Sequence, residues 1–367
     1  PVSAIPAELK QNVNAVVRED ETLFRINSQK SSSVHFHYVV TILNSNAQEY
    51  AIKYIGYDKM RRVKNLSASV YDAMGGSIKK LRTVDIYDQV AFDGISLYSD
   101  ARFKRFDLTQ GNFPYTVDIE YDMEYDYLFF IDGSAVAGEE KVSVEHFTYQ
   151  LSFPSNLKPR YKVYNIDKAP VKAQNSDGTE SITWTLDNVP ALKVEPMADA
   201  SEYIQRIEAA PSNFEIAGYS GSMTEWAELG EWLKKLNVGR DDLPEETRKK
   251  VRDLTSGLKT NEEKAKVLYE YMQQKTRYVS IQLEIGGYQT FEASTVDKTG
   301  YGDCKALSNY MVSMLKEAGV PAHYAIIMAG RNLITMDPQF PSSRANHAIG
   351  AVPNGRDTLW LECTSQT

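Results

Sequence analysis

One of the chain's two cysteines lies where a helix is expected to begin. Gly302 and Asp303 precede Cys304, and apolar residues such as Leu307 and Met311 follow at helical spacing. Asp is a preferred N-cap residue, so backbone N–H groups should converge near the thiol. A free cysteine has a pKa of about 8.5, which a helix N-terminus and a nearby imidazolium can lower. The same N–H groups can stabilise an oxyanion, so this segment predicts a nucleophilic thiol.

Two other residues, later in the sequence, could complete a thiol acyl-transfer site. His347 begins a strand-like segment, and Glu362 lies in a second one. Turn-forming residues at 353–355 predict that the two segments form a hairpin. Neighbouring antiparallel strands could then place both side chains on one face, where Glu362 would orient and stabilise a charged His347. His347 would serve as the base for Cys304 and as the acid for the leaving amine.

An oxyanion site needs a second hydrogen-bond donor, and we predict Gln282 for this role. Its side-chain amide is a suitable donor, and it lies in a strand-like segment just before Gly286 and Gly287. Tyr278 and Tyr301 are alternatives for the same role.

Each candidate also has a structural interpretation. Cys304 could be a small buried hydrophobe, His347 a core histidine, Glu362 a surface acid and Gln282 a structural amide. A disulfide between Cys304 and Cys363 would silence the nucleophile, but we expect two free thiols.

No metal or cofactor site is predicted. His35 and His37 share one face of a strand, as metal ligands can, but no third ligand is evident. Five acidic residues alternate along 118–126 and are therefore spread along a strand rather than gathered around a cation. Both patterns favour a hydrated sheet face, although exposed tyrosines there could still bind a glycan or an envelope protein.

Bulk composition excludes several function classes. The 367 residues are too many for one small core, so two or three domains are expected. A net charge of −8 without a Lys/Arg cluster argues against nucleic-acid binding. No apolar run is long enough to span a membrane. The first residue is Pro1, so we expect a processed chain whose signal peptide has been removed and a secreted or periplasmic location.

The first half of the chain predicts strands. Apolar or aromatic residues alternate with polar ones throughout 115–127, and a period of two over this length indicates a long antiparallel strand. A similar alternation covers 34–42, and further strands are expected at 143–153, 161–166 and 181–186. Glycine-containing turns separate these segments. We therefore predict an antiparallel β-sandwich over residues 1–210.

The pattern becomes helical after Pro211. Three helix starts are predicted before the cysteine block, at Ser222 with Glu225, at Pro244, and at Thr260 with Glu263. The helix that begins near Cys304 should end at about 318, before Gly319. Strand-like segments lie at 278–285, 322–328, 347–352 and 358–363. These elements predict an α+β domain over residues 211–367.

Residues in this domain resemble the signature blocks of the bacterial transglutaminase-like superfamily. The blocks are Gly302-Asp303-Cys304-Lys305, Asn346-His347-Ala348-Ile349 and Trp360-Leu361-Glu362-Cys363-Thr364. Residues 278–288 also resemble a segment that precedes the cysteine block in secreted members. The resemblance covers about 220–367. The first half resembles an uncharacterised β-sandwich domain that often precedes this core in Bacteroidetes-type proteins.

The resemblance implies a papain-like α+β core that acts on amide bonds without a cofactor. By position, its catalytic triad would be Cys304, His347 and Glu362. The family usually has Asp at position 362 and Pro at 363, so the longer Glu362 implies slightly different strand geometry. Many relatives continue into another β domain, so the chain could be a fragment truncated at its C-terminus.

Three hypotheses for function follow from these patterns. The first is a cell-envelope or secreted thiol enzyme that cleaves peptide or glutamine amide bonds, with hydrolysis favoured over amine transfer. The second is a transglutaminase-like scaffold or adhesion protein without activity. The third is a glycan-binding protein that uses the tyrosine-rich sheet. The sequence leaves the substrate and the oligomeric state open.

Overall fold

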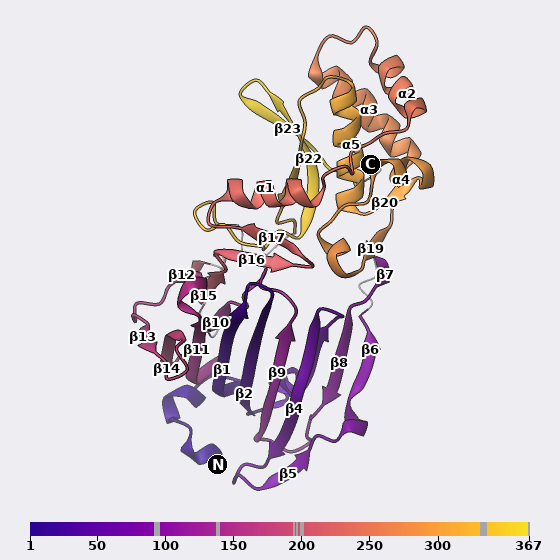
Figure 1. The fold of residues 1–367 in the computed structure, drawn as a ribbon. Helices are drawn as coiled ribbons and strands as arrows, with labels where there is room; N and C mark the ends of the chain where they lie inside the picture. The colour runs from indigo at the N-terminus through magenta and orange to yellow at the C-terminus, as the bar shows by residue number, and fades with distance from the viewer. Residues whose placement is uncertain are drawn as a thin grey trace. The chain divides into compact units, whose positions relative to one another are not determined.

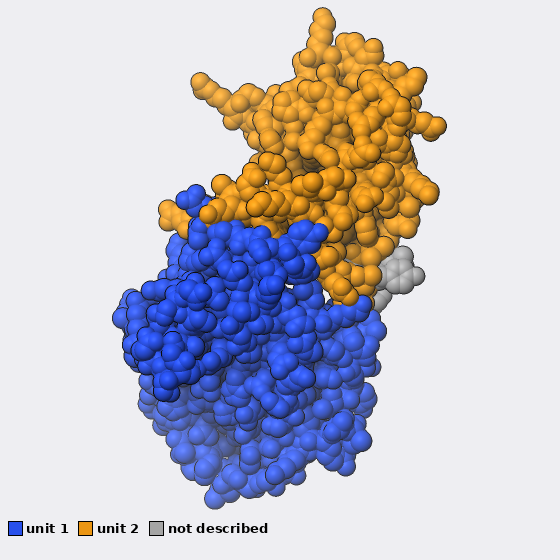
Figure 2. Space-filling view, viewed as in Figure 1, with its two compact units in different colours: residues 1–91, 101–226, 340–343 blue, residues 92–100, 227–339, 344–367 orange. Residues whose placement is uncertain are grey.

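The computed structural model describes residues 1–91, 96–136, 140–193, 195, 197–198, 202–330 and 336–365, without the side chains of 96–98 and 282. The chain divides into two compact units, which Figure 2 colours separately. Unit 1 contains residues 1–91, 101–226 and 340–343, and unit 2 contains residues 92–100, 227–339 and 344–367. Residue 210, where the sequence suggested a boundary, lies inside unit 1.

Unit 1 is built on an eight-stranded sheet in its described part (Figure 1). The strand order is β13-β14-β11-β1-β2-β9-β4-β5. The bounds are β1 Ala15–Ser28, β2 Ser31–Ile42, β4 Arg61–Tyr71, β5 Ser77–Lys80, β9 Tyr115–Tyr125, β11 Val142–Phe153, β13 Val171–Gln174 and β14 Glu180–Val189. The predicted alternation is confirmed in β9, where Val117, Ile119 and Met123 are buried and the intervening acids are not.

The predicted antiparallel arrangement is wrong for one pair of strands. β1 and β11 run parallel, with Ala15 opposite Val142 and Phe24 opposite Leu151. The other neighbours in this sheet are antiparallel. Parallel strands need a long crossover connection, and the chain between β1 and β11 includes much of the rest of unit 1. Local alternation reports which residues are buried but not the direction of a distant partner strand.

Two three-stranded sheets pack on the apolar face of the large sheet. They are β3-β8-β6 and β10-β15-β12. The Lys53 ammonium of β3 lies over the Tyr38 ring of β2, and Tyr161 of β12 packs edge-on against Trp184 of β14. The bounds are β3 Ile52–Tyr57, β6 Tyr87–Val90, β8 Arg102–Asp107, β10 Ser134–Val136, β12 Arg160–Tyr164 and β15 Gln205–Ala210; a hairpin of β16 Asn213–Ile216 and β17 Tyr219–Ser222 follows.

Unit 2 combines helices with a small sheet. The helices are α1 Trp226–Leu236, α2 Glu245–Thr255, α3 Asn261–Lys275, α4 Ala293–Thr299 and α5 Cys304–Glu317, and the antiparallel sheet has the order β21 His323–Ile327, β22 His347–Asn354 and β23 Asp357–Leu361 (Figure 1). The predicted start of α3 is confirmed, because Thr260 and Glu263 form a capping box. The helix α4 was not predicted.

The predicted strand at 278–285 is wrong in its extent. The structure has two short strands instead, β18 Arg277–Tyr278 and β19 Ser280–Gln282, followed by a 3-10 turn at Glu284–Gly287. β18 pairs with β20, Tyr301–Gly302, whereas β19 pairs with β7, Ser96–Ser99. The segment breaks because its two halves have different partner strands.

The helix α5 is the centre of the core of unit 2. Every residue from Cys304 to Leu315 is buried, because α2, α3, α4 and β22 surround the helix. Asp297 of α4 joins these helices: its Oδ1 atom accepts hydrogen bonds from Thr247 Oγ1 at 2.6 Å, from Tyr310 Oη at 2.7 Å and from Lys275 Nζ. One carboxylate therefore connects α2, α3, α4 and α5.

We predict that Asp297→Ala lowers the unfolding free energy of unit 2 by about 2–4 kcal/mol, measured by urea unfolding at neutral pH. Burial acts to raise the pKa of Asp297, but hydrogen bonds from Lys275, Thr247 and Tyr310 outweigh it and hold the pKa below its usual value. The stabilisation is therefore present above the unfolded pKa of about 4 and is lost in stronger acid.

Thr260→Ala provides the control for this experiment, because it removes only a helix cap and should cost about 1 kcal/mol. Equal losses in the two variants, or an Asp297→Ala loss that persists unchanged at low pH, would contradict the structural role of Asp297.

Candidate active site

Cys304 is the first residue of α5, and Asp303 caps the helix. The Asp303 Oδ1 atom accepts a hydrogen bond from the backbone N–H of Ala306 at 2.9 Å. A side chain at position 302 would lie 2.8 Å from the Ala306 Cβ atom, so the close approach of the turn to the helix requires Gly302. The Cys304 side chain is thereby fixed at the positive end of a rigid helix.

A buried ion pair supports this helix start. Lys305 Nζ contacts Asp303 Oδ2, and the two residues are only 6% and 1% exposed. A carboxylate without solvent would repel a thiolate next to it, and the ammonium group balances that negative charge. The sequence analysis did not assign Lys305 a role, because a lysine in the first turn of a helix normally points into solvent.

His347 begins β22, where it lies opposite Ile327 of β21. Its Nε2 atom is 2.7 Å from Glu362 Oε2, which leaves Nδ1 for the thiol. The pKa of His347 is raised to about 9, first by a hydrogen bond with Cys304 and then by the hydrogen bond and charge of Glu362, against the opposing effect of burial. The imidazole is therefore protonated at neutral pH and is held from both sides.

Glu362 follows directly after β23, and both of its carboxylate oxygens are occupied. Oε2 faces His347, and Oε1 accepts hydrogen bonds from the backbone N–H of Thr364 at 2.9 Å and from its hydroxyl at 2.6 Å. Burial acts to raise the pKa of Glu362, but the bonds from Thr364 and His347 outweigh it and lower the pKa. The acid thus stays ionised beside the imidazolium.

The helix α3 holds the segment that carries this acid. Tyr269 donates its hydroxyl hydrogen to the backbone carbonyl of Glu362, and Gln273 donates to the carbonyl of Ser365 at 3.1 Å. Neither α3 residue was predicted to support the site, because nothing local in the helix signals a partner about ninety residues away.

Cys304 and Cys363 are both free, so the alternative in which they form a disulfide is wrong. Cys363 is 3% exposed, and its Sγ atom lies 3.3 Å from the carbonyl oxygen of Leu361. Burial raises the pKa of Cys363 to about 12. The second thiol therefore belongs to the core.

Gln282 ends β19, but its side chain lies outside the described part of the structure, so its role as an oxyanion donor stays a prediction. Of the two alternatives, Tyr301 is 39% exposed in β20, and Tyr278 of β18 lies opposite Gly302. The structure thus shows Cys304, His347 and Glu362 together and leaves the second donor open.

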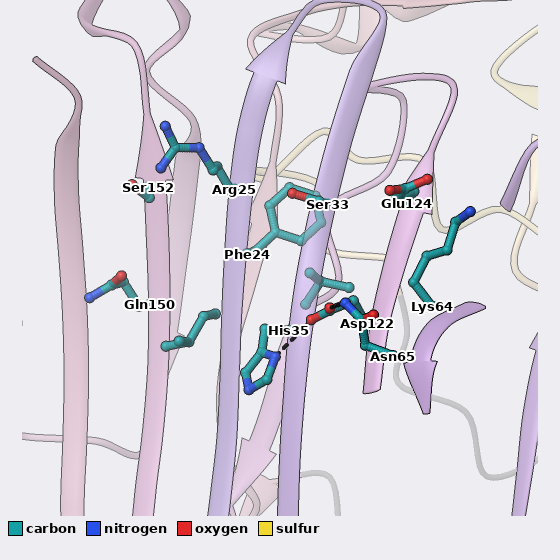
Figure 3. A pocket seen from close by; sticks show the side chains of 12 residues that line it. Phe24, Arg25, Ser33, His35, Lys64, Asn65, Asp122, Glu124, Gln150 and Ser152 are labelled. Atoms are coloured by element: carbon teal, nitrogen blue, oxygen red, sulfur yellow. Dashed lines mark hydrogen bonds and ion pairs between the residues drawn. The ribbon is translucent and has the colours of Figure 1, made fainter. Parts of the chain in front are cut away.

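A separate concavity of about 610 Å³ lies on the polar face of the large sheet in unit 1 (Figure 3). His35 Nδ1 is 2.7 Å from Asp122 Oδ1 there, and His37 Nε2 is 3.0 Å from Asp118 Oδ1. No group of three or more candidate metal ligands occurs among the described residues. Within the same residues, no helix is long and apolar enough to cross a membrane.

Two family models match separate segments of the chain. Residues 248–363 match the transglutaminase-like superfamily, and residues 28–193 match a domain of unknown function with a solved structure, DUF3857. A search of curated proteins finds no match.

Two solved structures show how far the similarity extends. A "putative protease" from Parabacteroides distasonis aligns with 95% of this chain and 67% of its own, with 16% identity and a TM-score of 0.71, which shows a shared fold. A "putative cysteine protease" from Cytophaga hutchinsonii aligns with 95% of this chain and 80% of its own, with 11% identity and a TM-score of only 0.26, which does not show a shared fold. The predicted resemblance and fold class are confirmed: a transglutaminase-like α+β core follows a β-rich domain.

We predict that the His347 imidazole titrates at a pKa of about 9 when it is followed by NMR of isotope-labelled histidine. Cys304→Ala should lower this pKa more than Glu362→Gln does, because the hydrogen bond with Cys304 is the larger cause of the shift. A pKa raised in the folded state stabilises the protein below the unfolded value of about 6.5, and this stabilisation is lost as the pH rises towards 9.

His146, which is bonded to Asp187 on the exposed face of unit 1, provides the internal reference signal in the same spectra. An unchanged His347 titration in both variants would show that the two contacts do not govern its charge.

Proposed function

We propose that this protein is a thiol hydrolase that cleaves amide bonds in peptides or proteins. The observation that carries the proposal is the double engagement of His347, which is hydrogen-bonded to Cys304 on one side and to Glu362 on the other. Nucleophile, base and orienting acid in hydrogen-bond contact form the arrangement that acyl transfer requires. The transglutaminase-like fold of this unit agrees with the proposal.

In the proposed reaction, the proton of the Cys304–His347 pair already lies on the imidazole, and the Cys304 thiolate attacks the carbonyl carbon of the amide. The backbone N–H groups at the start of α5 stabilise the resulting oxyanion. His347 then donates its proton to the leaving amine, and a thioester with Cys304 remains. Water attacks the thioester with His347 as the base, which releases the acid and restores the thiol. Glu362 keeps the imidazole oriented and stabilises its charged form throughout.

Hydrolysis is favoured over amine transfer because transfer needs a second binding site for the incoming amine. A water molecule needs only access to the thioester, and His347 is already placed to activate it. The substrate class is proposed from the chemistry of the site, because a thiolate can attack an amide carbonyl and the paired imidazolium can protonate the leaving amine.

We predict that iodoacetamide modifies Cys304 at least about 100-fold faster than Cys363 at neutral pH, measured by peptide mass spectrometry over time. Only Cys304 is paired with an imidazolium, whereas Cys363 is buried with a pKa raised to about 12. His347→Gln should slow the modification of Cys304 strongly and leave that of Cys363 unchanged. Equally slow modification of both thiols would instead favour a scaffold without activity.

We predict that a mixture of unstructured peptides acquires new N-termini on incubation with the protein, even when a fluorescent primary amine is present. Cys304→Ala should abolish this cleavage, and Glu362→Gln should reduce its rate by about 100-fold or more, because the imidazole loses its orienting charge. Incorporation of the amine without new N-termini, detected by mass spectrometry, would identify a transglutaminase instead and contradict the hydrolytic assignment.

A further inference from the structure

A group of charged and aromatic side chains inside unit 1 takes no part in the proposed reaction. Asp20 of β1 lies directly opposite Tyr38 of β2, on the face of the large sheet that β3 packs against. The Lys53 ammonium of β3 lies 5.4 Å from the centre of the Tyr38 ring. In the next row of the same face, Phe36 of β2 lies opposite Tyr121 of β9, and their rings stack with centres 4.9 Å apart. A carboxylate, an ammonium group and a phenol thus lie among three aromatic rings.

Solvent reaches this group although its surroundings are closed. Val34 and Val40, which flank it on β2, are 1% and 0% exposed, and Ile119 of β9 is 1% exposed. Asp20, Lys53 and the three aromatic residues instead keep part of their surface accessible. The packing between the layers of unit 1 is therefore incomplete at this place and leaves these side chains within reach of a molecule in solution.

The three polar groups lack side-chain partners in the part of the chain that the structure describes. Asp20 and Lys53 do not form an ion pair there, and neither they nor the Tyr121 hydroxyl takes part in a side-chain hydrogen bond. Burial raises the pKa of Asp20 to about 6 and lowers the pKa of Lys53, and each shift is opposed only by the charge of the other residue. Charges withdrawn from water cost free energy unless they are paired, so this arrangement indicates a partner that binds from outside.

The two charges define the chemistry of that partner. A group that binds Asp20 must donate hydrogen bonds and is best cationic, whereas a group that binds Lys53 must accept them and is best anionic. A neutral ligand leaves both charges without a counter-charge, and a simple ion neutralises only one. A compact zwitterion neutralises both, and an apolar group attached to it would pack against the stacked rings of Phe36 and Tyr121.

We propose that this place in unit 1 binds a small zwitterion, namely an α-amino acid with an apolar side chain. Its ammonium group donates to Asp20, and its carboxylate accepts hydrogen bonds from Lys53 and from the Tyr121 hydroxyl. Its side chain packs on the aromatic rings. The assignment does not rest on the proposed hydrolase, because none of these residues belongs to the candidate active site.

Calorimetric titration of the full chain with L-phenylalanine and two analogues tests the proposal. N-acetyl-L-phenylalanine lacks the cationic group, and 2-phenylethylamine lacks the carboxylate. We expect saturable binding of L-phenylalanine at neutral pH and at least about 10-fold weaker binding of each analogue, because each leaves one buried charge unpaired. The affinity of Cys304→Ala for L-phenylalanine should equal that of the wild type.

Substitution of each charge should act on the matching charge of the ligand. Asp20→Asn should weaken L-phenylalanine binding at least about 10-fold without weakening that of N-acetyl-L-phenylalanine, and Lys53→Met should do the same with respect to 2-phenylethylamine. Glu19→Gln is the matched control, since Glu19 lies near His37 and His146 on the other face of the sheet and should leave every affinity unchanged.

The stability of the variants separates a ligand site from a structural ion pair. Because the two charges are unpaired in the free protein, neither Asp20→Asn nor Lys53→Met should lower the midpoint of urea unfolding. A marked fall in both midpoints would identify a structural pair and overturn the proposal. So would the absence of saturable L-phenylalanine binding up to about 10 mM, or binding that neither substitution weakens, because water alone would then bridge the two groups.

Discussion

The hydrogen bond between His347 and Glu362 is the interaction on which the candidate site depends. It forms only while β22 and β23 keep their register, in which Gly350 lies opposite Leu361. A shift by one residue would turn every side chain of one strand to the other face and separate the acid from the imidazole. The strand pairing alone does not fix the position of the carboxylate, because Glu362 lies beyond the last paired residue. Tyr269 of α3 and the hydroxyl of Thr364 complete the constraint.

The position of the Cys304 thiol is also fixed by contacts from several elements. A nucleophile at a helix start is only as fixed as the helix, and α5 is enclosed by other elements of unit 2 over most of its length. Asp297 joins α5 to its neighbours, Ser308 donates to the carbonyl of Ala348 at 3.0 Å, and Asp303 caps the first turn. Helix and sheet therefore hold Cys304 and His347 in contact through one continuous core.

The sequence predicts those features whose signals are local. The alternation in β9, the cap at Thr260 and the start of α5 at Cys304 each depend on residues close together in the chain, and the structure has all three. The hairpin turn likewise predicted that His347 and Glu362 would be neighbours. Features with distant partners were missed or wrong: the parallel pairing of β1 with β11, the division of β18 from β19, and the hydrogen bond of Tyr269 with Glu362. Propensity and spacing carry no information about such partners.

The structure accounts for both departures from the usual family residues, Glu362 and Cys363. Side chains alternate along an extended segment, so Glu362 faces His347 while Cys363 faces the core beside α5. The second thiol is thus directed away from Cys304 and cannot trap it without a rearrangement of the strand. The longer reach of Glu362 needs an anchor that a shorter aspartate would not, because an extra rotatable bond costs orientation. Thr364 supplies that anchor by bonding Oε1 twice, which leaves Oε2 a single direction in which to meet the imidazole.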